Sequence, residues 1–174
     1  MAEATAGTVQ KVFKIMIRAD IHDVWREITR RDAPIKCFFN SRMDTGDLAA
    51  GSRLAMRTPD GKYTGVVGEI LEVQPPRRFA HTFQFTRLDD PPCKVVYELT
   101  PVEGGTEFIM RIEDLVPGSM MDKQMSQGAK LIMGTLKHVM ETGRPSMGVR
   151  MLFVLFKMLQ PIMPKRCLSE RWPV

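Results

Sequence analysis

Alternating apolar and polar positions mark six stretches of the chain as β-strands. The first, residues 11–18 (KVFKIMIR), places Phe13, Ile15 and Ile17 on one face. Five more stretches follow at residues 52–57, 62–73, 77–85, 94–100 and 106–112, separated by turn-forming sequences rich in Pro, Gly and Asp. Gly65 and Gly68 predict a bulge or strong curvature within their strand. Short strands joined by tight turns predict an antiparallel, curved sheet.

Helical spacing of apolar residues appears on both sides of this strand region. Asp20 is a candidate N-cap for a helix of about ten residues, and a short helical or irregular piece follows at residues 34–39. A longer helix is predicted from Ser119 to about Thr142, ended by Gly143. Its apolar residues form one continuous stripe: Met121, Met125, Ala129, Ile132, Leu136 and Val139.

This order of elements predicts an α+β protein in which a curved antiparallel sheet wraps around the long helix. The two short helices would close one end, and an imperfect fit between helix and sheet would leave a cavity. We divide the chain into a flexible N-terminus (residues 1–9), the sheet-and-helix domain (residues 10–142) and an apolar, basic C-terminal extension (residues 143–174).

Several short motifs in this order resemble a known superfamily. The opening VFKIMIRADIHDVWREITR, the stretch GEILEVQPPRRFAHTF and the hairpin ELTPVEGGTEF are similar to sequences of the helix-grip superfamily called SRPBCC, or START-like and birch-pollen-allergen-like. The nearest branch contains bacterial relatives of the C-terminal domain of the heat-shock-protein-90 ATPase activator. The resemblance covers residues 10–142 and implies the helix-grip fold with a deep, mostly apolar cavity.

The resemblance does not imply a single activity. The superfamily includes lipid carriers, polyketide cyclases, hydroxylase subunits and binding proteins without known chemistry, so function must be argued from the site. The principal hypothesis is binding of a small hydrophobic molecule, lipid-like or polycyclic and aromatic, between sheet and helix. The alternatives are a cyclase or dehydratase acting on a polyketide-like substrate, and a chaperone-associated interaction module. The resemblance covers one domain of the activator, so we do not expect co-chaperone activity to carry over.

The predicted cavity is lined by inward-facing residues of the sheet and the long helix. His81 or the Tyr97 hydroxyl would orient the ligand, and fourteen methionines in 174 residues would suit a wall that adapts to apolar shapes. The predicted lining residues are Trp25, His81, Phe83, Phe85, Tyr97, Leu99, Phe108, Met110, Met121, Met125, Ala129 and Ile132.

Catalytic chemistry has weak support in the sequence. His81 with Glu69 is the one acid/base pair to consider, and no nucleophile, phosphate or dinucleotide motif accompanies it. Cys37 and Cys93 fit small buried or half-buried hydrophobic positions rather than nucleophiles. The remaining histidines, His22 and His138, are expected to face solvent, so we predict neither a metal site nor a cofactor.

Charge and cysteine content narrow the class of partner and compartment. The net charge is +5 and the isoelectric point about 9.3, but no basic run exceeds two residues, so we do not expect nucleic-acid binding. Three cysteines without a CxxC spacing indicate no disulfide framework. Residues 1–10 contain no signal-like pattern, and a cytoplasmic location is expected.

The C-terminal extension carries an almost wholly apolar stretch at residues 149–163. It is too short to span a bilayer and is interrupted by Pro161, after which Pro164 also opposes a helix. Three interpretations remain open: a lid over the domain, a homodimer contact through residues 148–163, and peripheral contact with an anionic membrane in which Trp172 is an interfacial anchor.

Overall fold

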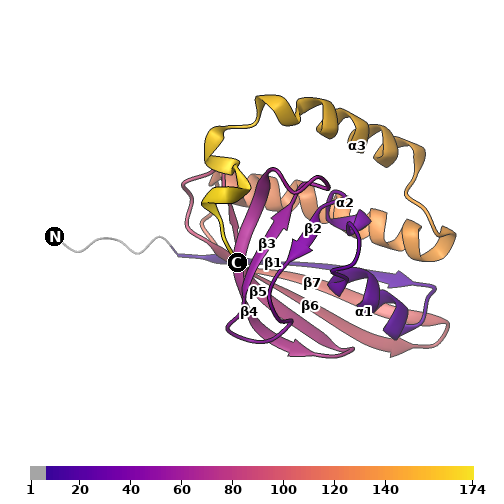
Figure 1. Ribbon diagram of the computed structural model, residues 1–174. Coiled ribbons are helices and arrows are strands. Elements are labelled where there is room, and N and C mark those ends of the chain that lie inside the picture. The colour runs from indigo at the N-terminus through magenta and orange to yellow at the C-terminus, as the bar shows by residue number, and fades with distance from the viewer. Residues whose placement is uncertain (1–6) are drawn as a thin grey trace.

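Seven antiparallel strands form one curved sheet in the order β1-β7-β6-β5-β4-β3-β2 (Figure 1). The computed structural model describes residues 7–174, so the prediction of a flexible N-terminus lies outside the described residues for positions 1–6. The strands are β1 Val9–Ile17, β2 Arg42–Asp44, β3 Arg53–Arg57, β4 Thr64–Gln74, β5 Arg78–Phe85, β6 Cys93–Val102 and β7 Gly105–Leu115. The six predicted strands are confirmed, whereas the three-residue β2 is too short to show an alternating pattern.

The irregularity predicted in the fourth strand is present. The register of β4 shifts against β3 between Met56 and Arg57, and against β5 between Ile70 and Glu72. Gly68 lies between these points, where a Cβ atom would be 1.9 Å from the Thr82 carbonyl oxygen of β5. Only glycine allows this close approach of the two backbones.

The two predicted helices of the domain are α1, Ile21–Thr29, and α2, Met120–Thr142, and a 3-10 turn η1 spans Lys36–Phe38. The Asp20 side chain accepts a hydrogen bond from the His22 amide, and the Ser119 hydroxyl accepts one from the Asp122 amide. Gly143 ends α2 with a φ of 79°. Both N-caps and this C-cap are therefore at the predicted positions.

The hydrophobic core lies between α2 and the facing side of the sheet. Every apolar residue of the predicted α2 stripe is buried, with Met121 2% exposed and Leu136 fully buried. Their partners on the sheet include Phe108, Met110 and Ile112 of β7. This is the predicted helix-grip arrangement, in which the long helix α2 lies across the curved sheet (Figure 1).

Beyond α2, the chain forms α3, Met147–Leu159, followed by the 3-10 turns η2 Gln160–Ile162, η3 Lys165–Cys167 and η4 Ser169–Arg171. The last residues return to the sheet, where Leu168 pairs with Tyr63 and Cys167 is fully buried. The Trp172 indole N–H donates to the Arg166 carbonyl, 2.7 Å away.

The helix α3 is the outermost element, and α2 lies between it and the sheet (Figure 1). None of its residues is buried. Among the helices of residues 7–174, none has the length and apolar character needed to cross a membrane.

Candidate functional site

Tyr97 of β6 is the centre of an aromatic cluster inside the domain. Its ring centroid lies 5.6 Å from that of Phe38 in η1 and 5.9 Å from that of Phe108 in β7. On the neighbouring strand β5, Phe79 and His81 lie 6.0 and 5.9 Å away. The strand alternation that turns residues 79, 81 and 97 inward therefore brings the two predicted polar groups, His81 and Tyr97, side by side.

His81 is a neutral imidazole at physiological pH. It is 4% exposed, and burial lowers its pKa from 6.5 to about 4. Its Nδ1 lies 2.7 Å from the Thr82 carbonyl oxygen. Because a carbonyl oxygen only accepts, Nδ1 carries the proton and Nε2 presents a lone pair. His81 is thus an acceptor inside an apolar wall.

The Tyr97 hydroxyl is the complementary donor. Burial raises its pKa far above the usual value, and the thiols of Cys37 and Cys93 add to that effect. Within residues 7–174, neither the Tyr97 hydroxyl nor His81 Nε2 has a hydrogen-bond partner. Each residue keeps a few per cent of its surface accessible, 3% for Tyr97 and 4% for His81. An uncharged donor and an acceptor are therefore available to a third group.

The remaining predicted lining residues belong to the same contiguous core. Seven of them are buried: Leu99, Phe108, Met110, Met121, Met125, Ala129 and Ile132. Trp25, Phe83 and Phe85 are half-buried and pack against this core. Trp25 makes an edge contact with Phe79 at 6.5 Å, which places it at the end closed by α1. These side chains pack closely around the Tyr97 cluster.

The structure does not bring Glu69 to His81. In the β4–β5 pairing, the residue opposite His81 is Ile70, which is fully buried, and Glu69 is exposed on the other face of the sheet. His22 and His138 are exposed as predicted, and Cys37 and Cys93 are buried as predicted. Across the described residues, no three His, Cys, Asp or Glu side chains converge as a metal site.

Glu27 of α1 is a residue that sequence reasoning missed. Its Oε1 is fully shielded from solvent and, among the described residues, is the one fully shielded side-chain N or O atom without a hydrogen-bond partner. Its Oε2 lies 3.3 Å from an Arg30 nitrogen. It lines a hollow of about 240 Å³ between α1 and Met140 of α2. Burial raises the pKa of Cys37, and the negative charge of Glu27 adds to that effect. Glu27 follows no motif, so the sequence carries no signal for it.

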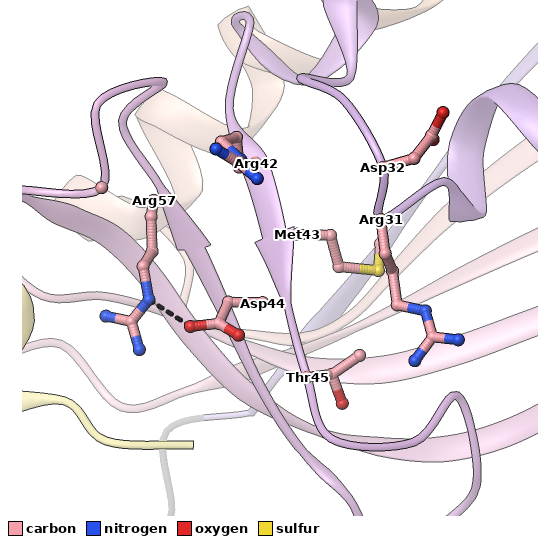
Figure 2. A pocket seen from close by; sticks show the side chains of 8 residues that line it. Arg31, Asp32, Arg42, Met43, Asp44, Thr45 and Arg57 are labelled. Carbon is pink, nitrogen blue, oxygen red and sulfur yellow. Dashed lines mark hydrogen bonds and ion pairs between the residues drawn. The ribbon is translucent and has the colours of Figure 1, made fainter.

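A larger hollow, about 770 Å³, lies along β2. Figure 2 shows that Arg57 points to Asp44, while Arg31 lies on the other side of β2. Arg57 Nε is 2.6 Å from Asp44, and the same guanidinium donates to the Trp172 carbonyl oxygen at 3.0 Å. Arg57 therefore holds the C-terminal residues against the sheet, and its guanidinium has a structural role.

Comparison with known proteins agrees with this architecture. Residues 7–141 match the sequence model of the family described as "Activator of Hsp90 ATPase homolog 1-like protein". No curated protein matches the chain.

Solved structures with the same fold have low sequence identity to this chain. Protein MLL2253 from Mesorhizobium loti is 20% identical with a TM-score of 0.63, over 76% of this chain and 97% of its own. The Aha1 dimer from Colwellia psychrerythraea is 16% identical with a TM-score of 0.62, over 78% of this chain and 98% of its own. DynU16, a protein in the dynemicin biosynthetic locus, is 19% identical with a TM-score of 0.64, over 78% of this chain and 48% of its own. At these identities the likeness shows the fold alone.

Proposed function

Because the chain belongs to the Activator of Hsp90 ATPase homolog 1-like family, whose helix-grip fold packs a sheet around one long helix, we propose that it binds a small hydrophobic molecule between sheet and helix. The ligand class is lipid-like or polycyclic and aromatic. Burial of its apolar surface would supply most of the affinity, at about 25 cal/mol per Å² before the costs of association.

One observation carries this proposal: Tyr97 and His81 lie among apolar side chains with 3% and 4% of their surface exposed, and within residues 7–174 neither the Tyr97 hydroxyl nor His81 Nε2 has a protein hydrogen-bond partner. Buried polar groups are nearly always hydrogen-bonded to protein or water. A ligand hydroxyl can accept from Tyr97 and donate to His81, whereas a ligand carbonyl can accept from Tyr97 alone. A mostly apolar molecule with one such oxygen is the chemistry that this pair recognises.

Methionines provide the means to admit the ligand. Met121 and Met125 of α2 are buried against the sheet, 2% and 4% exposed. Unbranched thioether side chains repack at lower cost than branched or aromatic ones. The bound molecule would therefore occupy space that these two side chains fill in its absence.

The test combines identification of a ligand with a matched pair of variants. Native mass spectrometry of freshly purified protein, followed by organic extraction, would identify any co-purifying molecule. Titration with a solvatochromic apolar dye and with a hydroxylated aromatic probe would then compare Tyr97→Phe with Tyr63→Phe, the chain's other tyrosine.

We expect Tyr97→Phe to weaken the hydroxylated probe about tenfold, the effect of one lost hydrogen bond, while dye binding is unchanged. Tyr63→Phe should alter neither. Absence of a co-purified molecule together with absence of dye binding to the wild-type protein would refute the proposal and leave a filled core.

The same pair also supports a second candidate, an enzyme of the cyclase or dehydratase type. A neutral His81 Nε2 can accept a proton while Tyr97 donates to a substrate carbonyl. Glu69 has no part in this arrangement because it is exposed on the other face of the sheet. A ligand recovered chemically unchanged after prolonged incubation with the wild-type protein would favour binding alone. Turnover that persists in His81→Leu would exclude His81 as the base.

A further inference from the structure

The net charge of the protein is confined to its C-terminal segment. Residues 1–142 contain nineteen basic and nineteen acidic side chains, whereas residues 143–174 contain six basic and one acidic, so the whole net charge of +5 lies in the last 32 residues. The helix-grip domain is neutral by comparison. A net positive charge concentrated in this way attracts negatively charged partners to the C-terminal segment.

The same segment presents an apolar surface that nothing in the described chain covers. We define the outer stripe of α3 and its following turn as Met147, Met151, Val154, Leu155, Met158 and Ile162, which share one side of the helix by spacing. Their exposed fractions run from 49% at Leu155 to 77% at Ile162.

The opposite side of α3 faces the domain. Val149, Leu152 and Phe153 are half-buried there, and the Phe156 ring contacts Phe39 of the domain at 6.2 Å. α3 is the outermost helix (Figure 1), and the outer stripe is its most exposed side. A folded chain that keeps six large apolar residues exposed in one row has a surface that is typical of a docking site.

Two cations lie on α3 itself, and others precede and follow this helix in the sequence. Arg150 and Lys157 lie seven residues apart on one flank of α3, and Arg144 precedes the helix. Beyond α3, Lys165 and Arg171 follow, and within residues 7–174 none of these five side chains forms a salt bridge with an acidic group. Arg166 is the exception in the segment, because it pairs with Asp89 at 2.7 Å. No acidic residue occurs between positions 142 and 169.

We propose that α3 docks on the surface of an anionic lipid bilayer, with its outer stripe in the interface and its flanking cations near the lipid phosphates. An apolar helix face bordered by Lys and Arg is the arrangement that binds in the interfacial plane of such a membrane. Crossing is not involved, because α3 has thirteen residues.

A second copy of the chain is a poorer occupant on the same evidence. A two-fold symmetric contact through α3 would bring Arg150 and Lys157 close to their own counterparts. With six basic side chains and one acidic in residues 143–174, each copy would meet a surface of its own sign. An anionic bilayer instead complements both the apolar stripe and the charge.

Vesicle flotation with the full-length protein tests the proposal. Vesicles of phosphatidylcholine alone are compared with vesicles of phosphatidylcholine and phosphatidylglycerol, at low and at high salt. We expect binding to the anionic vesicles, with weaker binding at high salt because exposed charges are screened. Replacing two outer-stripe residues, Met151→Glu with Met158→Glu, should abolish it.

The charge contribution has a closely matched control. Arg150→Gln with Lys157→Gln removes two cations seven residues apart on α3, and Lys123→Gln with Lys130→Gln removes two exposed cations seven residues apart on α2. We expect about thirty-fold weaker vesicle binding for the first pair, from the attraction of each cation to an anionic surface, and little change for the second.

Three results would overturn the proposal. Equal binding of wild type to neutral and anionic vesicles would remove the electrostatic argument. A dimer in analytical ultracentrifugation that the Met151→Glu and Met158→Glu variant loses, without vesicle binding by wild type, would assign the outer stripe to a second copy. A monomer that binds no vesicles and whose thermal stability falls in that variant would assign it to an internal contact. Dye binding in the interior should persist in the variant, so this test is independent of the proposed ligand site.

Discussion

Acidification should destabilise the protein through His81. The imidazole packs against Phe79 and Tyr97, with ring centroids 5.3 and 5.9 Å away, and burial lowers its pKa from 6.5 to about 4. In the unfolded chain the histidine regains its ordinary pKa. Below pH 6.5 the unfolded state therefore binds a proton that the folded state does not, and stability is lost as the pH falls from 6.5 towards 4.

The size of the effect follows from the two pKa values of His81, 6.5 in the unfolded chain and about 4 in the folded protein. Proton linkage converts this difference into a loss of about 2 kcal/mol between pH 7 and pH 5, and about 3 kcal/mol by pH 4. A domain with a typical unfolding free energy of about 5–15 kcal/mol would lose a substantial part of its stability through this one side chain.

Urea unfolding followed by tryptophan fluorescence at pH 7, 6 and 5 measures the loss. His81→Leu should remove the histidine contribution, so its stability should fall less steeply with acid than that of the wild type. His138→Gln, a change at an exposed histidine, should leave the slope unchanged. Carboxylates such as Asp122, whose pKa is lowered by a hydrogen bond from Lys11, titrate in both proteins and cancel in the difference. Identical slopes for wild type and His81→Leu would refute the argument.

Three further predictions concern stability and reactivity. In urea unfolding, Tyr97→Phe should change the unfolding free energy by less than about 1 kcal/mol, because no protein group within residues 7–174 pairs with the hydroxyl. Phe108→Ala, which removes a buried ring, should cost about 3–5 kcal/mol. Similar losses for the two variants would mean that the Tyr97 hydroxyl has a partner. Cys93, whose pKa burial raises to about 12, should not react with Ellman's reagent at pH 8 until the chain is denatured, and fast reaction in the native protein would contradict its burial. In urea unfolding, Gly68→Ala should cost more than about 2 kcal/mol because its Cβ would lie 1.9 Å from a β5 carbonyl oxygen. Gly134→Ala on α2, with open space around it, should be neutral or stabilising in the same measurement.

The fold was accessible from the sequence because its elements bury one face each. A strand with one buried face alternates, and a helix with one buried face repeats its apolar residues every three or four positions. The stripe from Met121 to Val139 on α2 is of this kind, and all of its residues are buried. β2 escaped prediction because three residues, Arg42–Asp44, contain a single buried position, Met43.

The site was accessible in part for the same reason. Alternation placed His81 and Tyr97 on inward positions of adjacent strands, and their rings lie 5.9 Å apart. The sequence did not show which face of the sheet Glu69 occupies, because the neighbouring glycines can interrupt the alternation of the strand. The pairing of Ile70 with His81 in the structure places Glu69 on the opposite face. Glu27 occupies a boundary position between the buried and exposed sides of α1, where no periodic pattern distinguishes a buried carboxylate from a solvated one.

The net charge shows why a whole-chain quantity can point to the wrong partner. A charge of +5 with an isoelectric point of about 9.3 suggests a basic surface spread over the protein. When the chain is divided at the end of α2, the domain before it is neutral, and the C-terminal segment has six basic side chains and one acidic. Because electrostatic attraction acts over about 10 Å at ordinary salt, the position of a charge relative to an apolar surface decides which partner benefits. The basic character of this chain therefore belongs to the surroundings of α3, and it bears on what covers that helix rather than on the ligand of the interior.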